Sequence, residues 1–268
     1  LPALPLAHAA QRAADLWWLQ PSRIVLLAIL PIYLGVLAYD FSRVVQNVYD
    51  RLVRISEDGR QVYPSLATSW TISDDGLVYT FKLQGKGRWS NGDPVTADDF
   101  VYGLRRSADP ATLSEYSAIL YPIENAAEVV AGTLPPERLG VRAVDAQTLE
   151  IRLHSPTPYL LGLLTHASTY PVHRKSVEQH GARFARPDTL VSNGPFRLGE
   201  WVVQSHIRLL RNPHYHDDAN TTLNEVWYYP VENAEAELNR YRAGELDLTE
   251  TVPARPRKPE RITAARVS

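Results

Sequence analysis

The chain has 268 residues, of which 44% are hydrophobic and 22% charged, the balance of an ordinary globular protein. Its formal net charge of −2 provides no basic surface of the kind that nucleic-acid binding needs, so nucleic acid is not an expected partner. Cysteine is absent, which excludes disulfides, thiolate nucleophiles and cysteine-ligated zinc. Methionine is also absent, even at position 1, and this favours a processed or excised piece of a longer product.

Residues 1–43 differ in texture from the rest and contain the apolar run IVLLAILPIYLGVLAY at 24–39. This run is interrupted by Pro31 and is short for a transmembrane helix, which needs roughly 20 residues. Arg23 in front of it is typical of a signal peptide, but no small-x-small cleavage site follows. Three interpretations stay open: an export or anchor segment, a buried helix, or sequence foreign to the domain.

The next stretches alternate between helical and strand patterns. Apolar residues at helical spacing predict a helix in VVQNVYDRLVRI at 44–55. SWTISDDGLVYTFKLQ at 69–84 predicts a hairpin, because Ser73-Asp74-Asp75-Gly76 is a turn sequence and the residues after it alternate in polarity. The chain therefore begins its regular part as a mixture of α and β elements.

The densest stretch is WSNGDPVTADDFVYGLRR at 89–106, and it could be either an active site or a helix start. Thr96 is placed as an N-cap, with Asp99 at the capping-box position. Asp98 and Asp99 make a poor catalytic pair, because adjacent residues of a helix point about 100° apart. We interpret the stretch as a capped helix.

The remaining elements are predicted from turn signals. Two strands surround Asp145-Ala146-Gln147 in 141–159, and a helix is expected at 159–168. A strand pair with a turn at Leu198-Gly199 is expected in 192–216, followed by a strand at 223–231. A helix in 234–250 ends near Gly244 and precedes a short strand. Residues 254–268 form a basic, proline-containing tail, which we expect to be extended or disordered.

The search for catalytic or metal-binding groups selects little. His166, His173 and His180 are spaced by seven, but Pro171 interrupts any helix that would align them. Asn212-Pro213 places the pair His214 and His216 in a turn, so no metal site is predicted. Asp247 and Glu250 are two carboxylates on a predicted short strand, and a hydrolase that uses them remains an alternative from another functional class.

Aromatic residues are frequent near the predicted turns, where tyrosine and tryptophan often line ligand clefts. Most of them are expected to be core residues. The set comprises Tyr116, Tyr121, Tyr159, Tyr170, Trp201, Trp227, Tyr228, Tyr229 and Tyr241.

Several blocks, read in order, resemble the extracytoplasmic solute-binding proteins of the peptide/nickel ABC transporter family, and most closely its oligopeptide-binding members. The similarity covers about 44–253, and blocks in one unbroken order are a stronger signal than any block alone. The blocks are LATSWTISDDGLVYTFKL, GRWSNGDPVTADDFVYGLRR, LGVRAVDAQTLEIRLHSPTPY, SNGPFRLGEW, RNPHYH and NRYRAGELDLT.

The resemblance implies a mixed α/β, periplasmic binding protein-like fold, with one discontinuous lobe and a peripheral α/β domain. It assigns 44–54 and 169–253 to that lobe and 55–168 to the peripheral domain. The family's second lobe is expected to be missing, and the apolar run stands where family members usually have an opening strand. These departures predict a chain that corresponds to the front half of a binding protein.

The resemblance also implies a function without catalysis or a cofactor: capture of oligopeptides outside the cytoplasm and delivery to membrane permease subunits. Membrane anchoring is one expectation for residues 1–43. Within the family, nickel chelates, heme or sugars are alternative ligands. Tyr241 matches a family tyrosine near the cleft, and Tyr116 lies near a family position that contacts ligand, so these two are the candidate ligand-binding residues.

Overall fold

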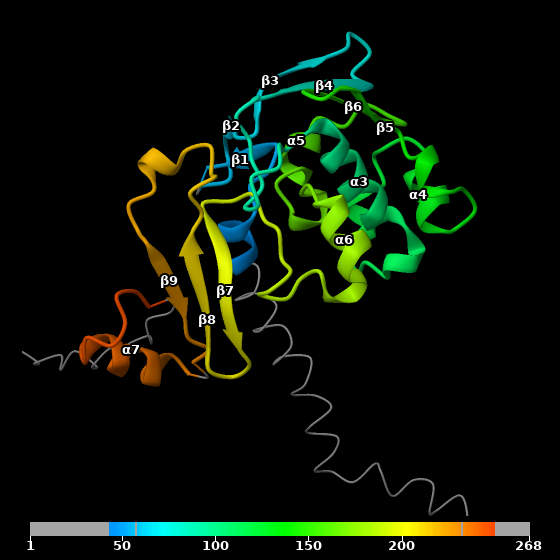
Figure 1. Ribbon diagram of the computed structural model, residues 1–268. Helices are drawn as coiled ribbons and strands as arrows, with labels where there is room; N and C mark the ends of the chain where they lie inside the picture. The colour runs from blue at the N-terminus through cyan, green and yellow to red at the C-terminus, as the bar shows by residue number, and fades with distance from the viewer. Residues whose placement is uncertain (1–42, 57, 232, 250–268) are drawn as a thin grey trace, which may run out of the picture.

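A computed structural model describes residues 43–56, 58–231 and 233–249 (Figure 1). The apolar run 24–39 and the basic tail 254–268 of the chain therefore lie outside the described residues. The described residues form a mixed α/β structure, the class that the sequence predicted, and contain three antiparallel sheets. In the described part, no helix combines the length and the apolar character needed to cross a membrane.

The predicted helix at 44–55 is only half present. Residues 43–48 are helical, and the chain then changes to strand β1 (Val53–Ile55), which pairs with β2 (Val62–Pro64). Leu52 and Val53 are almost fully buried, but in a different cluster from Val44 and Val48. One continuous helix could not serve both clusters, so the prediction was wrong beyond residue 48.

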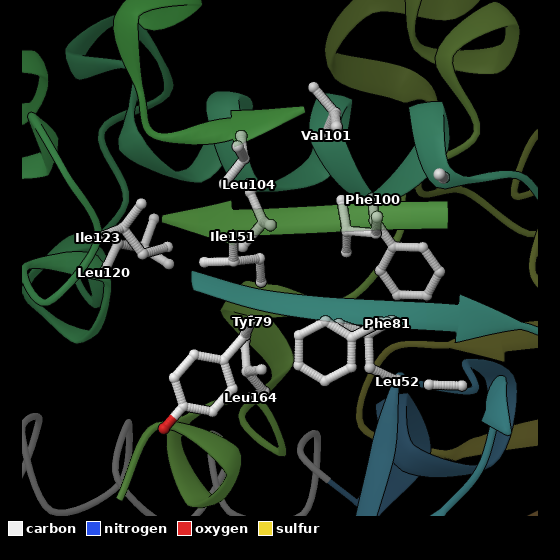
Figure 2. Packing of buried hydrophobic residues seen from close by; sticks show 14 of the residues in the cluster. Leu52, Tyr79, Phe81, Phe100, Val101, Leu104, Leu120, Ile123, Ile151 and Leu164 are labelled. Atoms are coloured by element: carbon white, nitrogen blue, oxygen red, sulfur yellow. The ribbon is translucent and has the colours of Figure 1, made fainter. Parts of the chain in front are cut away.

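The larger core lies beneath a four-stranded sheet of order β3-β4-β6-β5. Alternate residues of β4 point to opposite faces, so that Tyr79, Phe81 and Leu83 are buried while Lys82 is exposed. Figure 2 shows two of these rings packed with Ile151 and with Phe100 of the covering helix. The strands are β3 (Ala67–Ile72), β4 (Val78–Leu83), β5 (Val141–Asp145) and β6 (Thr148–Arg152).

Helices gather on one side of this sheet (Figure 1). Their bounds are α3 (Ala97–Ala108), α4 (Ala126–Val130), α5 (Leu160–Leu163) and α6 (Arg174–His180). Short 3₁₀ turns connect them: η2 (Pro110–Thr112), η3 (Ser117–Leu120), η4 (Pro136–Arg138), η5 (Ala167–Thr169) and η6 (Gly181–Arg183). The helix expected at 159–168 is thus a short α5 followed by η5.

The smaller core lies between helix 43–48 and a three-stranded sheet of order β7-β8-β9. The strands are β7 (Phe196–Val202), β8 (His206–Arg211) and β9 (Glu225–Tyr228), with η7 (Asp218–Asn220) before β9. Helix α7 (Ala234–Arg242) follows, beside the strand ends (Figure 1).

The turn predicted at Leu198-Gly199 was wrong. Strand β7 continues through both residues, with a bulge between Leu198 and Glu200, and the chain reverses only at 203–205. A glycine inside a strand commonly marks a bulge or a close approach, and Gly199 marks both. An added Cβ at this position would lie 2.9 Å from the Leu210 side chain.

The dense stretch at 89–106 is a capped helix start, as predicted. The Asp99 carboxylate accepts hydrogen bonds from the Thr96 backbone N–H at 2.8 Å and from its hydroxyl at 3.1 Å. The Trp89 indole donates to the same carboxylate at 3.3 Å. The backbone N–H and the hydroxyl of Thr96 are therefore both hydrogen-bonded at the start of α3.

We predict that Thr96→Ala lowers the free energy of unfolding by about 1 kcal/mol, because the helix start loses its hydroxyl. Urea denaturation followed by circular dichroism measures this change. Thr96→Ser keeps a hydroxyl and is the matched control, with a midpoint close to that of the parent chain. Equal midpoints for the alanine and serine variants would contradict the cap.

Candidate functional site

The polar centre of the structure is the carboxylate of Asp50, which is 2% exposed and lies directly after helix 43–48. It accepts hydrogen bonds from the Arg51 backbone N–H at 2.8 Å and from the Ser65 hydroxyl. Nε2 of His216 lies 2.8 Å from its other oxygen, Oδ2, whereas Arg54 Nη2 donates to Oδ1 at 3.3 Å. Groups from distant parts of the sequence therefore converge on one buried charge.

The block SNGPF joins the backbone of Asp50 to strand β7. Asn193 accepts from the Asp50 N–H at 3.0 Å and donates to the Asp50 carbonyl at 3.2 Å. The Gly194 N–H donates to the Val48 carbonyl at 2.9 Å. A Cβ on Gly194 would lie 2.6 Å from the Val48 carbonyl carbon, so only glycine allows this approach.

The block RNPHYH closes the other side. The Asn212 amide donates to the Gly194 carbonyl at 2.8 Å, and its oxygen accepts from the His214 N–H at 3.1 Å. The turn that follows brings Tyr215 to Arg54, whose Nη2 donates to the tyrosine oxygen at 2.6 Å. We call Asp50, Arg54, Asn193, Asn212 and His216 the polar junction.

The polar junction is electrostatically balanced. Burial by itself raises the pKa of Asp50, but the His216 hydrogen bond, the nearby Arg54 charge and the Ser65 hydrogen bond outweigh burial and lower it. Burial also raises the pKa of Tyr215, which stays a neutral acceptor for Arg54. Removal of one member of a buried, paired charge is costly, because its partners are then left without compensation.

Two of the surface hollows in the described part of the chain are large enough to consider as ligand sites. One of about 370 Å³ borders the polar junction and is lined by polar groups that include Arg54, Asp217 and Asn220. Another of about 780 Å³ lies beside α4 and includes Tyr121 and Glu124. Both are in the size range of small-ligand pockets, but neither is lined by Tyr116 or Tyr241.

The two candidate tyrosines are both solvent-accessible and lie on different parts of the molecule. Tyr116 precedes η3 and is 54% exposed, whereas Tyr241 lies on α7 and is 47% exposed. The structure brings Tyr116 against His166, with ring centroids 5.1 Å apart, and shows no contact between the two tyrosines. Exposed aromatic rings of this kind are suited to contact with a ligand that arrives from solvent.

His166 supports Tyr116 as a neutral ring. Its Nδ1 accepts a hydrogen bond from the Ser168 N–H at 3.2 Å at the start of η5. Burial lowers the pKa of His166, so the imidazole facing Tyr116 is uncharged at neutral pH.

His173 and His216 have structural partners. His173 accepts from the Ser176 N–H at 3.2 Å at the start of α6, and its Nε2 lies 3.0 Å from Asp93. His216 belongs to the polar junction. Among the described residues, no three or more histidine, aspartate or glutamate side chains are grouped so that they could hold a metal ion.

The carboxylates of the hydrolase alternative are not arranged as a pair by any strand. Helix α7 ends at Arg242 and Gly244 turns with a φ of 76°, after which 245–249 form turns and irregular backbone in place of the predicted strand. Asp247 is exposed there, and Glu250 lies outside the described residues.

Sequence reasoning missed the polar junction. The sequence does not single out Asp50, because it is one of several polar residues in the predicted helix at 44–55. Asn193 stands only in a family block, whereas Asn212 is also part of a turn signal with Pro213. The usable signal was the pair of asparagine-proline blocks, since asparagine side chains at turns commonly bond to backbone groups.

The chain belongs to the bacterial extracellular solute-binding proteins of family 5, whose middle-region model matches residues 61–265. It is 41% identical over 210 residues to the periplasmic oligopeptide-binding protein OppA of Salmonella typhimurium. It is 40% identical over 215 residues to the Escherichia coli protein named "Probable deoxycholate-binding periplasmic protein YgiS". The solved structure of Burkholderia pseudomallei OppA superposes with a TM-score of 0.74 at 37% identity.

These matches cover most of this chain and a minor part of each relative. The shares are 78% of this chain and 38% of Salmonella OppA, 80% and 40% for YgiS, and 78% and 41% for the Burkholderia structure. The mixed α/β fold described here is thus the fold of one portion of a periplasmic binding protein, and the predicted resemblance is confirmed.

We predict that Asp50→Asn lowers the free energy of unfolding by about 3 kcal/mol at pH 7, because Arg54 loses its buried counter-charge and His216 faces an uncharged amide. The folded pKa of Asp50 lies below its ordinary value of 3.8. Its stabilisation is therefore present above that value and is lost as the pH falls from there toward the folded pKa.

Urea unfolding between pH 3 and pH 7 tests both statements. The parent chain loses stability across the acid range, and Asp50→Asn loses less over the same range. Asp247→Asn replaces an exposed carboxylate and is the matched control, with stability close to the parent's. If the control and Asp50→Asn behave alike, the polar junction is not the electrostatic centre of the fold.

Proposed function

We propose that this protein is the solute-binding component of an ABC importer, which captures oligopeptides outside the cytoplasm and delivers them to a membrane permease. The observation that carries the proposal is the 41% identity over 210 residues to a periplasmic oligopeptide-binding protein. Relatives with periplasmic names support an extracytoplasmic location, and anchoring through 24–39 is part of the proposal.

The proposed domain organisation follows the two cores except at Leu52 and Val53, which fall within the lobe range but are buried in the larger core. Residues 44–54 and 169–253 form the discontinuous lobe, and 55–168 form the peripheral α/β domain. This division is supported by the smaller cluster, which joins Val44 and Val48 to Phe196 and Leu209, and by the larger cluster beneath the four-stranded sheet. We also infer that the Ser65 hydroxyl, which donates to the Asp50 carboxylate, fixes the peripheral domain to the lobe.

The ligand class is the finer part of the proposal. The OppA and YgiS names describe different ligands at nearly equal identity to this chain, so overall identity alone cannot select between them. We favour oligopeptides because Tyr116 and Tyr241 offer exposed rings and hydroxyls, and the resemblance implies that both lie near the family's ligand cleft. A nickel chelate, heme or sugar is the alternative.

We predict weak binding of trialanine by the 268-residue chain, with a dissociation constant of about 1 mM or weaker, equivalent to about −4 kcal/mol. The physical reason is that a cleft between lobes gains affinity by surrounding its ligand, whereas one lobe removes little of it from water. Tyr241→Ala abolishes the remaining signal, and Tyr241→Phe, which keeps the ring, retains most of it.

Nuclear magnetic resonance titration measures this binding, and mass spectrometry of the recovered peptide checks that it is intact. Micromolar binding by this chain would overturn the one-lobe interpretation. Cleaved trialanine would favour the hydrolase alternative. Tight binding of deoxycholate with no response to trialanine would reject the peptide class.

A further inference from the structure

Helix α7, which carries Tyr241, is attached to the molecule without entering either core. None of the residues of Ala234–Arg242 is buried. Its first turn is capped by Asn233, whose side chain accepts from the Ala236 N–H at 2.7 Å, but this bond lies within the segment itself. The orientation of α7 on the sheet therefore has to come from contacts made at its surface.

One such contact is a guanidinium over an aromatic ring. Cζ of Arg240 lies 4.9 Å from the centroid of the Tyr229 ring. The Arg240 Nε donates to Glu245 at 3.0 Å, which holds the guanidinium from the far end of the helix. Arg240 and Tyr241 are neighbours in sequence, so whatever fixes the first restricts the second.

Tyr229 is itself held by a stack that we call the aromatic ladder: His206, Trp227 and Tyr229. The Trp227 and Tyr229 rings are nearly parallel, at 9° with centroids 6.2 Å apart. The His206 ring lies 4.9 Å from that of Trp227, and Arg208 lies 5.1 Å over the same indole. Pairs of this geometry add to stability beyond the area they bury.

The ladder follows from the alternation of β9. Val226 and Tyr228 pack on the smaller core, so Trp227 points to the opposite face of the sheet, and Tyr229 continues the same alternation. Arg208 is the register partner of Trp227 and donates two hydrogen bonds to Glu225 at 2.9 and 2.7 Å. The sheet thus builds a fixed platform on the face away from its core.

We propose that Tyr229 and Arg240 are positioning residues: the aromatic ladder captures the Arg240 guanidinium, sets the orientation of α7 and thereby places Tyr241. The consequence for ligand contact rests on the proposed function, whereas the orientation of α7 does not. Loss of the ring removes the platform, and loss of the guanidinium removes the clamp.

Hydrogen exchange of the α7 amides in the 268-residue chain tests the structural part. Tyr229→Leu and Arg240→Gln are each expected to speed exchange of α7 about three- to fivefold, the factor for one surface cation–π contact. Tyr229→Phe keeps the ring and stays near the parent rate. Exchange in β4 and β6 stays unchanged in every variant, which separates a local effect from unfolding.

Trialanine titration of the same variants tests the ligand part. Tyr229→Leu is expected to weaken the response at the Tyr241 ring, whereas Tyr241→Ala removes ligand contact but leaves α7 exchange at the parent rate. Unchanged α7 exchange in both Tyr229→Leu and Arg240→Gln overturns the positioning role. Faster exchange with no trialanine response in the parent chain would instead uphold that role and reject the proposed ligand.

Discussion

The buried charge of Asp50 is the constraint on which the rest of the arrangement depends. A carboxylate 2% exposed needs partners in fixed places, and here they come from Arg54, Ser65 and His216. Those partners end the helix at 43–48, start the first sheet and hold the turn after β8. Because each partner lies on a different segment, one desolvated group fixes the relative position of the two apolar cores.

Local signals predicted the local parts of this fold. The hairpin of β3 and β4, the strands β5 and β6, and the start of α3 at Thr96 all depend on residues within one turn or one hairpin. The errors arose where distant partners decide. The helix predicted at 44–55 breaks because Asp50 bonds to Asn193 and His216, 143 and 166 residues away. Gly199 suggested a turn, and only its pairing with β8 shows it to be a bulge.

The candidate site was predictable only as single residues. Family blocks indicated Tyr116 and Tyr241, and both side chains are exposed. Their supports could not be predicted in the same way. His166 contacts Tyr116 from 50 positions along the chain. Arg240 on α7 contacts Tyr229 across the connection between β9 and α7. Ring contacts of this kind leave no periodic pattern, because they depend on how two elements finally pack.

The paired hydrogen bonds between Asp50 and Asn193 also bear on how the chain folds. They join the two ends of a loop of 143 residues, which we call its neck. The loop contains the whole four-stranded sheet, so the chain enters and leaves this part of the fold at two hydrogen-bonded residues. Loop closure costs little more once the enclosed chain is itself compact, since the cost grows only with the logarithm of the free length. The enclosed sheet therefore has the anatomy of an insertion, which can be lengthened, exchanged or removed at its neck while the smaller core keeps its own connectivity.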